Sequence, residues 1–289
     1  MINNLHGKRI LSVLAHPDDE AFGMGGTLAL YAMRGAEVYL ACATLGEAGD
    51  IPPDFLQNHS SSGALRESEL DCSADALALK QVFKLGFRDS GMAGSPDNQH
   101  PDALVARPME EVVERIADVM RQVRPQVVLT FDPVGGYYHP DHIRVHQATV
   151  LAFNRVRQEL SASDPQALTR LYYHTMPKSS AKFAVFWMRL QGKDPRKVGR
   201  NGDIDLLQIA SVSFPVHVKV NYRLVLKQRE QAAACHASQG GGQKPSGLNT
   251  WLLRLFSRPV DRFMQAFPEP KPRQRMKNDL FWGIDDELT

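Results

Sequence analysis

The hydrophobic positions of the chain fall into two kinds of segment that alternate along most of its length. Short apolar runs rich in Val, Ile and Leu predict buried strands. Such runs occupy residues 8–15, 37–44, 81–87, 126–131 and 170–176, and residues 204–220 predict one or two more strands. Between these runs, apolar residues recur every three or four positions, which predicts helices. The predicted helices span residues 25–34, 62–79, 109–123, 143–160 and 222–237.

Strands that alternate with helices predict one open, mainly parallel α/β sheet with helices on both faces, because crossover connections are right-handed. Sheets of this kind carry ligand sites beyond the carboxyl ends of their strands. We expect this domain to span residues 1–239, because a run of three glycines follows Gln239 and breaks the pattern. Residues 240–289 are expected to form a C-terminal extension with an amphipathic segment at 251–267.

The composition is that of an ordinary soluble protein. Of the 289 residues, 43% are hydrophobic and 23% are charged. No stretch approaches the roughly 20 apolar residues that span a bilayer. The net charge of +2 comes without a dense Lys/Arg stripe, so we expect no nucleic-acid partner and no membrane contact, while homo-oligomer formation stays open. The N-terminus lacks the layout of a signal peptide, which favours a cytoplasmic location.

The three cysteines, Cys42, Cys72 and Cys235, lie far apart in the chain. An odd number at unpatterned spacing argues against a disulfide framework and against a cysteine-based zinc site. We therefore expect buried thiols.

Two polar motifs stand where predicted strands end: HPDDE at 16–20 and HPDH at 139–142. His16 and Asp19 are three residues apart, so one turn can aim both at a point, and the second motif offers a further imidazole. Two imidazoles and one carboxylate leave positions open for water and substrate, as in a catalytic zinc site, and the same set suits Fe²⁺. The alternative is that the histidines bond neighbouring loops and the aspartates cap helices, which explains one motif better than two.

Several further stretches extend the pattern. They are TLGEAG at 44–49, RESEL at 66–70, RDSGM at 88–92, and the longer forms AHPDDE at 15–20 and GGYYHPDH at 135–142. With these stretches, which cover most of residues 8–150 in order, the chain resembles the LmbE/PIG-L family of zinc-dependent N-acetylglucosaminyl deacetylases. The resemblance implies a Rossmann-like fold and removal of acetyl groups from N-acetylglucosamine-type substrates, including inositol- and thiol-linked glucosaminides. Beyond residue 160 the match is weak.

Carried over by position, the resemblance implies that His16, Asp19 and His142 bind zinc. It also implies that Asp18 is the general base and that His139 faces the substrate carbonyl. A carboxylate beside metal-activated water can accept its proton, and a protonated His139 could stabilise the oxyanion. Either His139 or a protonated Asp18 could then protonate the leaving amine.

Three other residues, Asp141, His146 and His236, are candidates for supporting roles at the site. Asp141 is expected to orient or charge His139, with a helix N-cap as the alternative. His146 is expected to support or pack beside the site rather than bind metal. His236 ends a predicted helix, where an imidazolium is favoured, although the family often has a similar His-x-Ser-Gln near its substrate rim.

Substrate contacts are predicted from the resemblance at Glu47, Arg66, Arg88, Asp89 and Tyr137. The two arginines suit sugar hydroxyls or a phosphate, and surface ion pairs are the alternative. Glu47 would hydrogen-bond a sugar or order its own loop. Tyr137 occupies a place where the family often has a mobile tyrosine.

Three other functions can be compared with these residues: a dinucleotide site, a non-catalytic metal-binding module and an amidase for larger amides. A dinucleotide site fails by spacing, because the glycine fingerprint that begins at Gly23 would require glycine where Leu28 stands. A non-catalytic metal-binding module would not need the neighbouring base. A zinc amidase that cleaves a larger amide, such as a thiol conjugate, stays open, because loops at 50–60, 90–105 and 178–200 decide acyl size.

Overall fold

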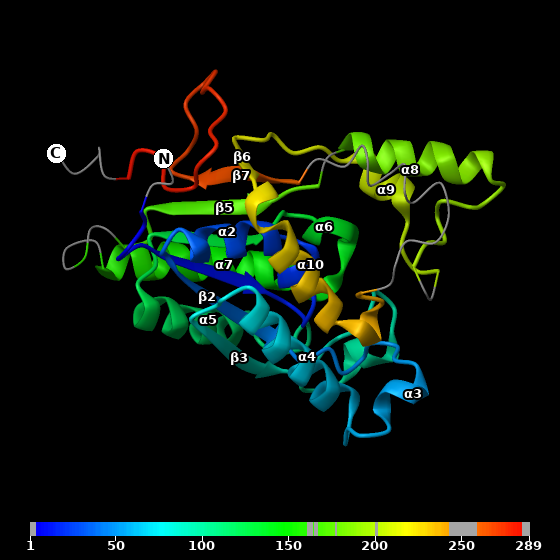
Figure 1. Ribbon diagram of the computed structural model, residues 1–289. Coiled ribbons are helices and arrows are strands. Elements are labelled where there is room, and N and C mark those ends of the chain that lie inside the picture. The colour runs from blue at the N-terminus through cyan, green and yellow to red at the C-terminus, as the bar shows by residue number, and fades with distance from the viewer. Residues whose placement is uncertain are drawn as a thin grey trace.

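The computed structural model describes residues 4–160, 164, 167–176, 178–199, 202–242 and 259–284, and these build a seven-stranded sheet (Figure 1). The strands are β1 (Arg9–Leu14), β2 (Glu37–Thr44), β3 (Gln81–Phe87), β4 (Val127–Phe131), β5 (Arg170–His174), β6 (Val218–Asn221) and β7 (Val260–Phe267). Their order across the sheet is β3-β2-β1-β4-β5-β7-β6. The first five run parallel, and β7 is antiparallel to both of its neighbours. The predicted open, mainly parallel α/β fold is confirmed.

The helices cover the sheet in two layers. They are α1 (Asp19–Phe22), α2 (Gly25–Met33), α3 (Pro53–Leu56), α4 (Ser62–Ala76), α5 (Met109–Val123), α6 (Gly135–Tyr138), α7 (Pro140–Leu160), α8 (Lys178–Leu190), α9 (Leu206–Ser211) and α10 (Leu226–Cys235). Helices α5 and α7 pack on each other and on β1, whereas α10 packs on α2 and α4. No helix in the described part of the chain is both long enough and apolar enough to cross a membrane.

The chain direction across the sheet reverses between β1 and β4. Strands β2 and β3 follow β1 on one side, and the chain then returns to place β4 on the other. In open α/β sheets a crevice forms at such a switch point, outside the carboxyl ends of the two strands. The first histidine motif begins directly after β1, and the second follows the turn after β4, so the fold brings them together.

The expected boundary at residue 240 does not separate two structural units. Strand β7 comes from the predicted extension and lies between β5 and β6, with Phe263 fully buried opposite Val218 (Figure 1). The alternation of this strand is hard to see in the sequence because its buried face also carries Asp261 and Gln265. The part of the amphipathic segment at 251–258 lies outside the described residues.

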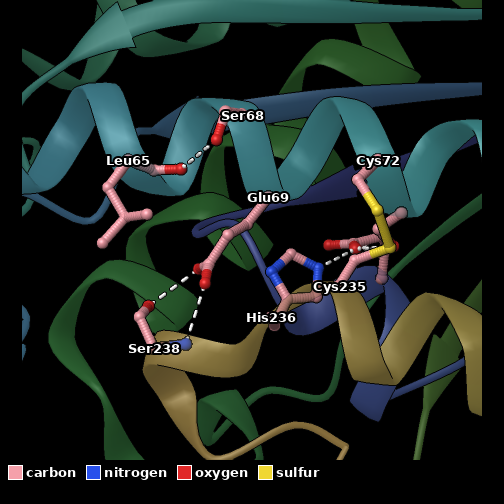
Figure 2. Close-up of a disulfide and its surroundings, with 9 residues drawn as sticks. Leu65, Ser68, Glu69, Cys72, Cys235, His236 and Ser238 are labelled. Carbon is pink, nitrogen blue, oxygen red and sulfur yellow. Dashed lines mark hydrogen bonds and ion pairs between the residues drawn. A yellow bond between two sulfur atoms is a disulfide. The ribbon is translucent and has the colours of Figure 1, made fainter. Parts of the chain in front are cut away.

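The expectation of three thiols is wrong for two of the cysteines. Cys72 on α4 and Cys235 at the end of α10 form a disulfide, with their Cα atoms 5.8 Å apart (Figure 2). The two residues are 163 positions apart, and only the packing of α10 on α4 brings them together. Cys42 is a buried thiol, as predicted.

Candidate functional site

The two histidine motifs form sharp turns after β1 and β4. The second turn is held by Asp132, whose Oδ1 accepts hydrogen bonds from the backbone N–H groups of Val134 (3.1 Å) and Gly136 (2.9 Å). Gly135 in this turn has φ +63°, and a Cβ there would lie 2.7 Å from the Cβ of His142. A glycine at this position therefore lets the turn press against the start of α7.

The hydrogen bonds of two imidazoles leave one nitrogen of each turned inward. His142 Nδ1 lies 3.1 Å from the carbonyl oxygen of Gly135, so Nδ1 carries the proton and Nε2 keeps its lone pair. His16 Nε2 lies 3.2 Å from a carboxylate oxygen of Asp141 and 3.3 Å from one of Asp89, which leaves Nδ1 on the inner side. Carboxylate and carbonyl partners of this kind orient metal-binding histidines.

The inward atoms converge with the carboxylate of Asp19. His16 Nδ1 and His142 Nε2 are 3.1 Å apart, and the Asp19 oxygens lie 3.3 Å from the latter nitrogen and 3.6 Å from the former. Two ligand atoms of one tetrahedral zinc ion are separated by about 3.3 Å. These residues therefore fit a divalent cation.

A proton competes for the same place in the metal-free chain. Burial lowers the pKa of His16, but the carboxylates of Asp89 and Asp141 outweigh burial and raise this pKa well above its ordinary value. Because a metal ligand must be deprotonated, we expect metal binding to weaken as the pH falls.

Other histidine and carboxylate groups also approach each other. His16, His139 and His142 place ligand atoms within 4.8 Å of one another, as do His16, Asp89 and Asp141. The second set uses the outer nitrogen of His16, so it is better explained as support for that imidazole. His146 bonds the carbonyl oxygen of Phe131 through Nδ1 and packs on Tyr173, away from the converging atoms.

Asp18 stands beside the converging atoms in an unusual backbone conformation, with φ 117°. A guanidinium nitrogen of Arg66 lies 3.1 Å from its carboxylate, and Arg66 also donates to the backbone carbonyls of Pro17 and Gly46. Burial raises the pKa of Asp18 to about 7, although the charge of Arg66 acts in the opposite direction. A carboxylate with such a pKa can accept and release a proton near neutral pH.

His139 and Asp141 differ from expectation in their contacts. His139 Nδ1 accepts a hydrogen bond from the backbone N–H of Asp141 (3.2 Å), so its proton sits on Nε2. Burial and the nearby His16 and His142 lower the pKa of His139 well below its ordinary value, so this imidazole is neutral rather than protonated. The Asp141 carboxylate turns to His16 instead of His139, because the backbone turn already satisfies His139 Nδ1.

A cavity of about 680 Å³ opens in front of these groups. Its lining includes three of the predicted substrate contacts, Arg66, Asp89 and Tyr137. The other two side chains have protein partners: Glu47 accepts from the backbone N–H of Asp89 (2.9 Å), and Arg88 pairs with Asp97 at 2.7 Å. The bond of Glu47 ties its loop to the segment that follows β3.

Other parts of the cavity wall lie outside the two histidine motifs. Residues 91–95 line it, as do Asp203 and Ile204 before α9 and Gln239 after α10. The first two residues of the 91–95 segment belong to the RDSGM stretch, and Gln239 ends the His-x-Ser-Gln stretch, whereas Asp203 and Ile204 had no sequence signal. Asp132 was also missed, although an aspartate between a buried strand and two glycines is typical of a residue that orders a turn.

Comparisons with known proteins find relatives along most of the chain. The family model described as GlcNAc-PI de-N-acetylase (PIG-L) matches residues 11–153. A 1D-myo-inositol 2-acetamido-2-deoxy-alpha-D-glucopyranoside deacetylase from Acidothermus cellulolyticus is 32% identical over 299 aligned residues, which cover 96% of each chain.

Solved structures share the fold at low sequence identity. The N,N'-diacetylchitobiose deacetylase from Pyrococcus horikoshii has a TM-score of 0.56 and 19% identity, with 89% of this chain and 83% of that chain covered. The 4-carboxy-2-hydroxymuconate hydratase GalB from Pseudomonas putida has a TM-score of 0.58 and 18% identity, with 92% and 99% covered. Since one of these enzymes is a deacetylase and the other a hydratase, the fold alone does not decide the reaction.

Proposed function

The chain belongs to the PIG-L family, and on this premise we propose that it hydrolyses the N-acetyl group of an N-acetylglucosaminide. The observation that carries the proposal is the convergence of His16 Nδ1, His142 Nε2 and the Asp19 carboxylate. An inositol-linked glucosaminide is the first substrate to test, because the relative that aligns with 96% of this chain is named for that compound.

His16, Asp19 and His142 would hold the metal, and their two nitrogens and one carboxylate suit Zn²⁺, with Fe²⁺ as the second candidate. When bound, such an ion lowers the pKa of water and polarises the amide carbonyl. The cavity in front of the three residues leaves room for the sugar.

The protein groups around this point divide the proton transfers between them. Asp18 accepts a proton from the attacking water, and Arg66 holds its carboxylate in place. His139 is neutral and carries its proton on Nε2, so it donates a hydrogen bond to the carbonyl oxygen as negative charge develops there. Asp18, with a pKa of about 7, then returns the proton to the leaving amine, and acetate and the free amine result.

The test measures metal content by mass spectrometry together with amine release from N-acetylglucosaminyl-inositol and simpler N-acetylglucosamines. Near-stoichiometric zinc or iron and chelator-sensitive amine release are expected. Metal without amine release from any acetylated sugar would favour the amidase for a larger amide. A folded protein that binds no divalent metal would overturn the proposal.

A further inference from the structure

Glu20, the last residue of the first motif, is a buried carboxylate that bonds three other residues. Its side chain is fully buried at the start of α1. One carboxylate oxygen lies 2.6 Å from His236 Nε2 and accepts the Ser73 hydroxyl, and the other accepts the backbone N–H of Asp18 at 3.0 Å.

The partners of Glu20 require a carboxylate. The Asp18 N–H and the Ser73 hydroxyl donate, and His236 Nε2 donates when it carries the proton, so both oxygens must accept. A glutamine has the same shape but would turn its NH₂ group toward a donor.

The hydrogen bond that Glu20 accepts from Asp18 lies at a strained point of the backbone. Asp18 has φ 117°, a conformation that is strained for a non-glycine residue and persists only where its surroundings hold it. Glu20 and Arg66 hold this residue from two sides, at the backbone N–H and at the carboxylate.

His236 is in turn fixed to α4. It directly follows Cys235, whose disulfide to Cys72 joins the two helices (Figure 2). Ser73 directly follows Cys72, so the disulfide lies beside both residues that bond Glu20. One turn earlier on α4, Glu69 accepts hydrogen bonds from the backbone N–H (2.8 Å) and hydroxyl (2.7 Å) of Ser238 (Figure 2). The end of α10 is thus bonded to α4 on both sides of His236.

We propose that Glu20 is a positioning residue for Asp18 and that His236 holds Glu20 in place. The inference rests on the proposed role of Asp18 as the base. The proposal assigns a function to the His-x-Ser-Gln stretch. His236 is fully buried behind the turn that carries Asp18, whereas Gln239 lines the cavity.

The test compares glutamine variants of two buried glutamates, Glu20 and Glu69. Glu20 bonds His236 and Glu69 bonds Ser238, both just after α10. Glu20→Gln is expected to keep its metal and a KM within about threefold of wild type while kcat falls ~100-fold, the order of loss that small misplacement of a catalytic group causes. Glu69→Gln replaces one of the two oxygens that accept from Ser238 and alters no bond to Asp18, so its kcat should stay within about threefold. A Glu20→Gln enzyme that is folded, metal-loaded and equally active would overturn the proposal, as would equal losses in both variants.

A second pair separates the hydrogen bond of His236 from its bulk. His236→Gln keeps a donor near the place of Nε2 and should retain most of the kcat, whereas His236→Leu should lose it as Glu20→Gln does. Equal activity in the two variants contradicts the role of His236.

The positioning role can also be judged without turnover. If the wild type hydrolyses no acetylated sugar, the proposed function fails, and a crystal structure of Glu20→Gln then decides the positioning. Departure of Asp18 from its left-handed conformation supports the inference, and an unchanged φ overturns it.

Discussion

Two adjacent polar clusters in this protein differ in how their hydrogen-bond donors and acceptors are arranged. The acceptor cluster, His16, Asp19 and His142, directs nitrogen lone pairs and carboxylate oxygens at one another. In the paired cluster, Glu20, Ser73 and His236, the serine hydroxyl and His236 Nε2 both bond a carboxylate oxygen of Glu20. Asp19 and Glu20 are adjacent in the sequence, so the difference comes from the partners that the fold supplies.

The acidity of the carboxyl groups shows the same contrast. Burial raises the pKa of Asp19 to about 6 despite the nearby His16. Glu20 is fully buried, and burial alone would raise its pKa too, yet the bond to His236 leaves it lowered. Acceptor atoms that face one another in a buried site call for a cation, and acceptors paired with donors stabilise the framework around it.

The largest effect is expected from opening the acceptor cluster. His142→Ala removes one of the three converging atoms, so the variant should lose both bound metal and at least ~1000-fold in kcat/KM. Metal analysis and amine release on the same sample check this. His146→Ala, which removes an imidazole that faces Phe131 and Tyr173 instead, is the matched control and should keep its metal.

Removing the base should separate metal binding from turnover. Asp18→Asn keeps the shape and the three converging residues, so metal content should be unchanged while kcat falls ~100- to 1000-fold. Activity near that of wild type would show that another group accepts the proton.

Breaking the disulfide tests how much the paired cluster depends on it. The bond closes a loop over 163 residues, so the double variant Cys72→Ala with Cys235→Ala should lower Tm by roughly 5–10 °C. Its kcat at 25 °C should change little, because Glu20 keeps its hydrogen bonds. The measurement is a thermal melt with and without dithiothreitol: reduction should shift the wild type and leave the variant unchanged, and an unchanged wild-type Tm would contradict the contribution of the bond.

A smaller effect is expected at Asp261, a buried acid on β7 that accepts hydrogen bonds from the backbone N–H and hydroxyl of Thr27. Burial raises its pKa from 3.8 to about 6. The folded chain therefore binds more protons than the unfolded chain between these values, and stability falls as the pH rises through that window. Asp261→Asn keeps an acceptor for Thr27, so it should raise Tm by a few degrees at pH 7 and barely change it at pH 4; a lower Tm at pH 7 would contradict this account.

The sequence was most informative where chemistry and local structure coincide. Polar motifs at the ends of β1 and β4 could be placed at one edge of the sheet, because parallel strands bring those ends together. The contacts of Asp141 and the neutral state of His139 depend on a turn whose shape no spacing encodes. Strand β7 and the disulfide depend on packing between segments far apart in the chain, and Asp261 and Gln265 hide the buried face of that strand.

The most direct test of the central claim is an anomalous difference map, recorded at the zinc edge from crystals grown with Zn²⁺ near pH 7.5. The account predicts one strong peak within bonding distance of His16 Nδ1, His142 Nε2 and the Asp19 carboxylate, which disappears in His142→Ala crystals. A peak bound to Asp89 and Asp141 instead, or no peak in this crevice, would contradict it.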